Sequence, residues 1–452
     1  MDNPLIILLF LCVELILFYV VIIRQFSWYF LALPSGFFLA GFLIFVVVPG
    51  CFNYFLLGWR QSYENGIIYL IVILVNPVIL TCTILCFPKR IKVLCRNVRE
   101  KSKKGFKTHR LVLYAVLFAV GVILYKLFNE SALHQLLLKP GGFGEIVTIN
   151  QLRSDFDVGL KGSIFSYLTQ IMSFSFMPMV VLIAYLAYKS RKSVWGMGEL
   201  FLVIIASSGV SLLSLHKGPI LSLFIPVLIS VYVSADSGKS RSVRSLVFLF
   251  CGLFVLSTLT WIMHQGRLLS DFGELYENLL FRVFVSPSRA IINHIQFAEA
   301  EGFRGISVYR ILSNLAGMEF TRPANELYLW IYDRGGEINT MNACYIGSAY
   351  LGWGILGVAV HSVLLGIFFV CIETMYASQV LSDLMYASLI TTSACMLNLV
   401  SVDAITFMNT FGGLYLVLWG GILVFHRGFV RVRRESWYGA ARSEEHSIGK
   451  QS

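Results

Sequence analysis

The chain has 452 residues, of which 57% are hydrophobic and 13% are charged. Soluble proteins carry about 45–50% apolar and about 25% charged residues, so a soluble chain of this composition could not cover its own core. The composition also excludes disordered, collagen-like and disulfide-stapled classes. It predicts an all-α, polytopic integral membrane protein.

A membrane-spanning helix needs about 20 mostly apolar residues, and about eleven segments show this pattern. The residues His216-Lys217-Gly218-Pro219 interrupt one long apolar run, and proline suits the first turn of a new helix. We expect a tight turn between two helices there, or a broken helix. The spans are expected at about 4–23, 27–48, 66–87, 111–128, 165–187, 199–215, 219–234, 246–263, 349–371, 385–402 and 406–425.

Lysine and arginine gather on alternate connections, as they do on cytoplasmic loops. The connection at 88–110 holds ten of them, and placing it inside puts 23 of the 36 Lys and Arg residues on that side. Only the 372–384 turn departs, with two acids and no base. We attribute the net charge of +11 to this orientation and expect no nucleic-acid partner. The domain 1–426 then has an external N-terminus and is followed by a basic cytoplasmic tail, 427–452.

Two connections on the outer side, about 129–164 and about 264–348, are too long to be simple connectors. The second is predicted to contain a helix at Pro287–Glu301, and it holds seven arginines and no lysine. The planar fork of arginine grips phosphate or carboxylate through two parallel hydrogen bonds. We expect at least two or three of these arginines to meet an anionic ligand. For each one, pairing with an acid of the same loop is the alternative, and Arg304 is interpreted as a solvated member.

Other polar residues lie where helices reach the outer side. Arg153 is a candidate anion ligand or the partner of a nearby aspartate. His216 and Lys217 face a lipid headgroup, or the lysine snorkels to the interface. Asp403 has no sequence-local partner and is a functional candidate, with pairing to a base as the structural alternative.

Two local patterns concern packing and stacking. The four glycines between 347 and 357 frame the entry to the ninth expected span and should allow close helix packing. The three aromatic residues at 328, 330 and 332 form either an interfacial belt or a sugar-stacking platform. No metalloprotease, esterase or P-loop motif occurs, which argues against a protease, an esterase or an ATPase.

Six pieces follow one another in order between about Ile146 and Gly420. They are Arg153, the turn Leu215–Leu221, Arg282 within Leu279–Phe284, Arg322-Pro323, the Gly-aromatic-Gly segment Ile346–Gly357, and Asp403. Taken together, this pattern resembles the Wzy-type O-antigen and oligosaccharide repeat-unit polymerases. Members of that family often carry arginine where Lys217 stands, and their Arg-x(n)-Gly spacing is met only loosely in the two external loops.

The resemblance implies a glycosyltransferase of the bacterial inner membrane, without metal or cofactor, that acts in lipopolysaccharide or other polysaccharide biosynthesis. The donor is a growing glycan on undecaprenyl pyrophosphate, and the acceptor is one repeat unit on the same carrier. A chain-length regulator protein and membrane lipid are further partners. The N-terminus is periplasmic.

In that reaction a hydroxyl of the acceptor attacks the anomeric carbon of the donor, and the lipid pyrophosphate leaves. Fixed cations stabilise the leaving group, and a carboxylate acts as base or orients the hydroxyl. A flippase for the same lipid-linked oligosaccharide and an O-antigen ligase remain open as alternatives. The expected carboxylates are Asp403 and Glu326, and the expected cations are Arg153, His216, Lys217, Arg282, Arg289 and Arg322.

Overall fold

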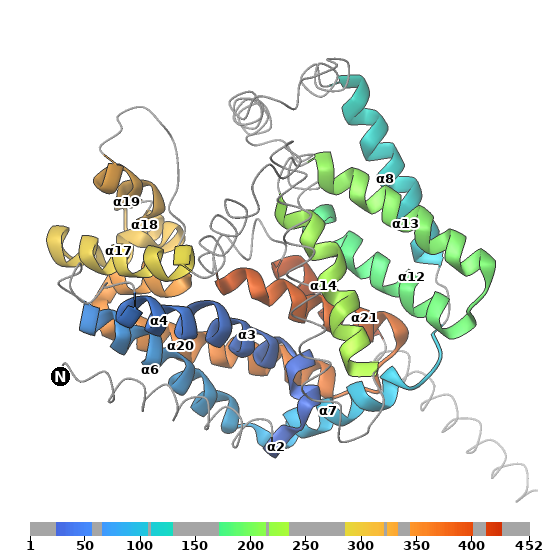
Figure 1. Ribbon diagram of the computed structural model, residues 1–452, viewed down its shortest axis with the longest axis horizontal. Helices are drawn as coiled ribbons and strands as arrows, with labels where there is room; N and C mark the ends of the chain where they lie inside the picture. The colour runs from blue at the N-terminus through green and yellow to red at the C-terminus, as the bar shows by residue number, and fades with distance from the viewer. Residues whose placement is uncertain are drawn as a thin grey trace, which may run out of the picture.

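The computed structural model is all-helical in the part of the chain that it describes, and no strand occurs there (Figure 1). The all-α prediction is therefore confirmed for these residues. They are 24–56, 66–106, 110–129, 171–213, 217–234, 285–320, 323–332, 344–400 and 413–426.

The elements follow one another in a simple order along the chain. They are α2 (Arg24–Phe26), η2 (Trp28–Ala32), α3 (Pro34–Phe42), the π-helical η3 (Leu43–Val47), α4 (Val48–Leu56), α6 (Gly66–Leu85), α7 (Pro88–Ser102), α8 (Arg110–Asn129), the π-helical η4 (Met172–Phe176), α12 (Met177–Arg191), α13 (Val194–Leu213), α14 (Lys217–Ser234), α17 (Ser286–Glu301), η6 (Gly305–Val308), α18 (Arg310–Leu315), α19 (Pro323–Tyr332), α20 (Tyr345–Ala377), α21 (Asp383–Met396), η7 (Leu397–Val400) and a last helix, Gly413–His426.

Several of these helices have the character of membrane spans. Three shorter apolar helices, 112–124, 222–234 and 413–426, coincide with further expected spans. The spans expected at about 4–23 and 246–263 lie outside the described residues. Six helical stretches are long and apolar enough to cross a membrane: Pro34–Tyr54, Ile68–Leu85, Met172–Arg191, Val194–Ser211, Tyr345–Ala377 and Asp383–Val400.

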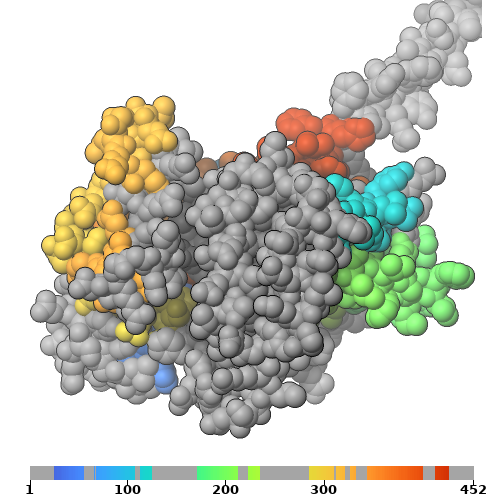
Figure 2. Space-filling view, turned by 90° about the horizontal axis from the view of Figure 1, so that it is seen from above, coloured from blue at the N-terminus to red at the C-terminus, as the bar shows by residue number. Residues whose placement is uncertain are grey.

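The helices form two packed groups that share α21. In one group, α6 and α20 pack together with α3, and α17 lies along α20; in the other, α12 packs with α13 and α14. Figure 2 shows residues 286–332 at one edge of the molecule and the helices around α8 and α13 at the opposite edge. Helix α21 contacts α3, α12 and α14, and its residues from Met385 to Met396 are all buried. Its Ser393 hydroxyl donates to the carbonyl of Ala32 at 2.8 Å, which fixes α21 to the first group.

Two expected helix boundaries can now be placed. The span expected at 27–48 begins only at Pro34, because Ser27 has a φ of 72° and residues 28–32 form a 3-10 helix. Proline at the first helical turn is favourable, since its missing N–H would have no partner there. The interruption near His216 separates two helices, since α13 ends at Leu213 and α14 begins at Lys217.

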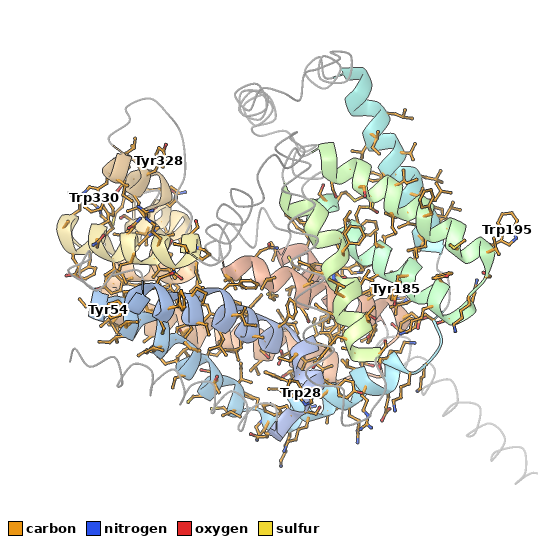
Figure 3. The ribbon with its side chains drawn as sticks, viewed as in Figure 1. Trp28, Tyr54, Tyr185, Trp195, Tyr328 and Trp330 are labelled. Atoms are coloured by element: carbon orange, nitrogen blue, oxygen red, sulfur yellow. The ribbon has the colours of Figure 1, made fainter. Side chains whose placement is uncertain are left out.

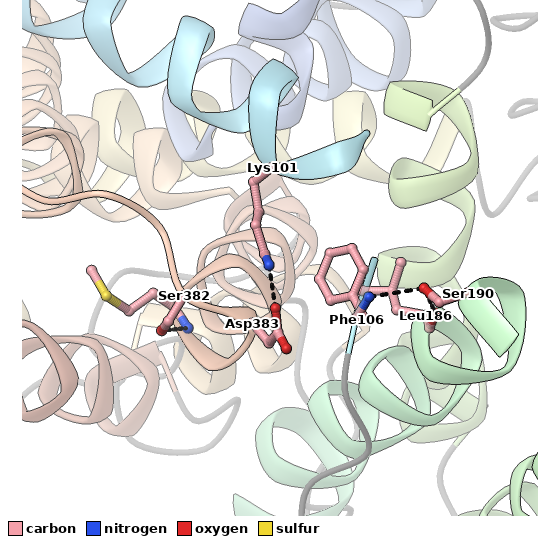
Figure 4. Close-up of polar contacts among 7 residues, drawn as sticks. Lys101, Phe106, Leu186, Ser190, Ser382 and Asp383 are labelled. Carbon is pink, nitrogen blue, oxygen red and sulfur yellow. Dashed lines mark hydrogen bonds and ion pairs between the residues drawn. The ribbon is translucent and has the colours of Figure 1, made fainter. Parts of the chain in front are cut away.

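Connections that were assigned to one side of the membrane meet at α7 and at the residues just after it. Asn97 donates to the carbonyl of Gln379 at 3.2 Å, in the turn between α20 and α21. The backbone N–H of Phe106 donates to Ser190, near the end of α12, at 2.9 Å (Figure 4). The Arg99 guanidinium lies 5.9 Å from the ring of Tyr29, next to Trp28, which Figure 3 shows at the opposite end of the first group from Tyr54. The structure therefore brings together connections that the charge pattern placed on one side.

The 372–384 turn departed from that charge pattern, and its two acids explain why. Glu373 is not in the turn, because α20 continues to Ala377. The side chain of Glu373 is buried within the protein. Asp383 forms an ion pair with Lys101 of α7, and both side chains are at most 14% exposed (Figure 4). The acid of the turn is thus neutralised by the basic connection beside it.

This buried pair gives a first prediction. Asp383→Asn is expected to lower the free energy of unfolding by about 3 kcal/mol, because removing one partner leaves an uncompensated buried charge. Denaturant unfolding of the purified chain in detergent measures this. Glu100→Gln is the control, since Glu100 and Arg96 are 4.0 Å apart and mostly exposed. If the exchanged pair Lys101→Asp with Asp383→Lys is no more stable than Asp383→Asn alone, the ion pair does not hold α7 in place.

Helix α20 is two helices joined by a sharp reversal. Trp353 and Gly354 leave helical geometry, and Gly354 has a φ of 61° and a ψ of -146°. That conformation is open only to glycine. The Tyr345 hydroxyl lies 3.5 Å from the hydroxyl of Ser362, which is 17 residues further along the chain. A straight helix would separate the two positions by about 25 Å. Both hydroxyls donate to the side chain of Asn76 in α6, so the segment 345–352 folds back along the helix that follows it.

A buried carboxylate joins the last turns of α20 to the start of α3. Glu373 accepts from the backbone N–H of Ser35 at 2.9 Å and from its hydroxyl at 2.5 Å. Ser35 is in the first turn of α3, where backbone N–H groups have no partner within the helix. A negative charge is also favourable at a helix N-terminus. Glu373 thus caps α3 although it is 338 residues away from Ser35 in sequence.

Candidate functional site

Most of the site residues expected from the sequence fall outside the described parts of the chain. Glu326 on α19 and Arg289 on α17 are described with their side chains, and Lys217 is placed as the first residue of α14 by its backbone alone. The others lie in the ranges that the structure does not describe: Arg153, His216, Arg282, Arg322 and Asp403.

Glu326 lies opposite Arg304, at the junction of α17, α19 and the first part of α20. The guanidinium of Arg304 is 3.8 Å from the carboxylate of Glu326, and the two side chains are 35% and 39% exposed. Two contacts position the arginine. Its backbone N–H donates to the carbonyl of Leu351 at 2.9 Å, and its guanidinium lies 5.7 Å from the ring of Phe297. Its Nε is buried without a hydrogen-bond partner in the described part of the chain.

The interpretation of Arg304 as a solvated arginine is therefore wrong. The alternative for this residue, pairing with an acid of the same connection, is the one that the structure bears out. The sequence concealed the pair because the partners lie far apart in the chain, on either side of α18. The pair forms because α19 packs back onto α17.

Aromatic side chains surround the pair. The ring of Phe297 meets that of Trp330 edge-on at 5.7 Å, and the rings of Phe303 and Tyr350 meet in the same way at 5.8 Å. The Tyr350 hydroxyl donates to Glu299 at 2.6 Å. Because residues two apart on a helix point in nearly opposite directions, Tyr328 and Trp330 of α19 do not make one platform (Figure 3).

A second aromatic cluster lies at the reversal of α20. Tyr309 stacks on Trp353 at 5.4 Å and on His361 at 5.1 Å. Burial raises the pKa of the Tyr309 hydroxyl well above its ordinary value, so it stays a neutral donor. His361 Nδ1 is 2.8 Å from the carbonyl of Gly357. This contact engages Nδ1, so Nε2 is the ring nitrogen that is left for other contacts.

Sequence reasoning missed this second cluster. The glycines beside it carried the only signal, and they were interpreted as packing residues. Gly352 does allow close packing, because a Cβ there would lie 3.2 Å from the Tyr309 hydroxyl. Gly354 serves the chain reversal through its positive φ.

Arg289 belongs to a different part of α17. It is half-buried near the start of the helix, and its Nε is enclosed without a hydrogen-bond partner in the described structure. About 12 Å of helix rise separates it from Phe297, on which Arg304 packs. The neighbouring Ser288 donates to the carbonyl of Val46 at 3.3 Å, in the middle of the span Pro34–Tyr54. The structure therefore does not group Arg289 with Glu326.

The junction offers a cation, a carboxylate and aromatic surfaces within reach of solvent. A carboxylate accepts hydrogen bonds from sugar hydroxyls, and a guanidinium donates hydrogen bonds to phosphate. Aromatic rings pack against the apolar faces of sugars. Within the described ranges, no three His, Cys, Asp or Glu side chains gather as a metal site would require. The chain matches no protein-family model, and comparison with curated proteins and with solved structures found no similar protein.

Proposed function

We propose that the chain polymerises lipid-linked oligosaccharide repeat units in the bacterial inner membrane, as a glycosyltransferase of the Wzy type. The observation that supports this most directly is the Arg304–Glu326 pair. It remains accessible at one edge of a bundle of apolar helices, beside aromatic side chains. Such a position suits a substrate whose lipid lies in the membrane and whose sugars and phosphates lie outside it.

The chemistry needs one group to handle a proton and others to hold negative charge. The acceptor hydroxyl forms a bond to the anomeric carbon of the donor, the bond from that carbon to pyrophosphate breaks, and the hydroxyl proton passes to a carboxylate. Glu326 takes the proton or orients the hydroxyl, with Asp403 as the second candidate. The leaving pyrophosphate gathers charge, and fixed cations stabilise it. Arg153, Lys217, Arg282 and Arg322 are assigned to that role.

The remaining assignments concern binding rather than chemistry. His216 and Arg289 contact the lipid-linked glycan, and no cofactor is needed for the transfer. The rings of Phe297 and Trp330 offer a stacking surface beside the carboxylate. A chain-length regulator would act through the assembled polymer or through this protein.

The decisive experiment is a gel of surface polysaccharide from a deletion strain, complemented by the intact gene. Single repeat units on the lipid-A core, restored to long polymer by the gene, support the proposal. Polymer that accumulates on the carrier but not on the core would identify a ligase. Repeat units trapped on the cytoplasmic side would identify a flippase. Either of the last two results rejects the proposal.

A further inference from the structure

Helix α7 and its C-cap carry a straight stripe of positive charge. Its members follow one another at spacings of three and four residues, so they share one side of the helix. All five side chains are exposed, and the stripe extends about 21 Å. The members are Lys89, Lys92, Arg96, Arg99 and Lys103.

The rest of α7 fixes the direction in which this basic stripe points. Ile91, Leu94, Cys95 and Val98 are buried against the bundle. Lys101 turns inward to Asp383 and is not part of the stripe. The apolar side of α7 therefore packs on the protein, and its basic side points outward. Basic residues clustered directly after a membrane-spanning helix are attracted to the anionic membrane interface.

The surroundings of α7 place it at such an interface. It begins at Pro88, directly after the candidate span that ends at Leu85. Phe87 is 46% exposed at the junction, and Val380 is 71% exposed next to Gln379, which Asn97 of α7 contacts. Exposed apolar side chains beside a basic stripe would insert at the boundary of the acyl chains, with the bases at the level of the headgroups.

We propose that the basic stripe of α7 binds the phosphate headgroups of anionic membrane lipids. Five like charges at these spacings repel one another along the helix, and an anionic surface removes that cost. Glu100 is the single acid within α7, and its contact with Arg96 is long and exposed. An acidic soluble protein would match the charge, but it would not account for the exposed Phe87 and Val380 beside the span.

The test uses the full chain in mild detergent, titrated with dioleoylphosphatidylglycerol or dioleoylphosphatidylcholine, with the thermal midpoint as readout. Phosphatidylglycerol is expected to raise the midpoint and phosphatidylcholine is not. Lys92→Gln with Arg96→Gln should weaken the apparent affinity for phosphatidylglycerol about 30-fold, since each base near an anionic surface contributes about fivefold. High salt should weaken it as well.

The matched control removes two charges outside the stripe, one from α7 and one just after its C-cap. Arg90→Gln with Lys104→Gln should keep most of the lipid effect, because Arg90 is exposed on another side of α7 and Lys104 is exposed beyond its C-cap. Lys92→Arg with Arg96→Lys should keep it too. If both double glutamine variants lose it equally, only overall charge matters and no stripe exists. If neither lipid raises the midpoint, the stripe does not bind lipid headgroups. If the stripe variant nevertheless loses activity in cells at matched protein levels, an acidic protein binds the stripe instead. Both results overturn the proposal.

Discussion

Glu326→Gln is expected to lower the rate of polymer formation by about 10²–10⁴-fold, the usual contribution of a positioned general base. Glutamine keeps the size of the side chain and removes the charge that accepts the proton. The chain should still insert and fold, because Glu326 is only half-buried and its partner Arg304 keeps its contacts with Leu351 and Phe297. The measurement is polymer length and yield from purified lipid-linked repeat units at matched protein levels.

The control for this variant is Glu301→Gln. Glu301 is exposed at the end of α17, so its loss removes the same charge from the same region. Normal polymer from Glu301→Gln and almost none from Glu326→Gln is the expected pair of results. Normal polymer from both would assign Glu326 to the ion pair alone and would leave Asp403 as the carboxylate to test.

The sequence was sufficient to predict most of the apolar helices that the structure describes, and the helix at Pro287–Glu301. A run of about 20 apolar residues predicts a membrane helix by itself, and it needs no knowledge of its neighbours. The helix at 287–301 has a proline in its first turn, which is also a local signal. The charge pattern predicted which connections lie together, and the contacts at α7 agree with it.

Contacts between distant residues could not be predicted in this way. Glu373 caps α3 through Ser35, 338 residues away, and Arg304 finds Glu326 only after α19 has packed on α17. Each acid had several bases or donors available to it, and a sequence pattern cannot choose among them. The reversal of α20 was missed for a different reason. Its residues are mostly apolar, so hydropathy reports one continuous span, and only the glycines between 352 and 357 mark the turn.

Gly357→Ala is expected to destabilise the protein by about 2–3 kcal/mol, as overpacking of a close contact does. In the folded-back arrangement of α20, a Cβ at position 357 would overlap the carbonyl oxygen of Ala349 and lie 3.3 Å from the Cβ of Trp353. The backbone of Ala349 cannot rotate away as a side chain could, so the two halves of α20 must separate. A loss of this size changes abundance in the membrane several-fold.

The matched control for that substitution is Gly121→Ala, in α8. A Cβ there meets nothing within 4 Å, and alanine favours a helix over glycine by about 1 kcal/mol. Gly121→Ala should therefore be neutral or slightly stabilising, as measured by detergent-solubilised thermal unfolding and by membrane abundance. Were α20 a straight helix, Gly357 and Ala349 would lie about 12 Å apart along its axis, and Gly357→Ala would stabilise the protein just as Gly121→Ala does. The sign of the change at Gly357 therefore distinguishes the folded-back hairpin from a continuous span.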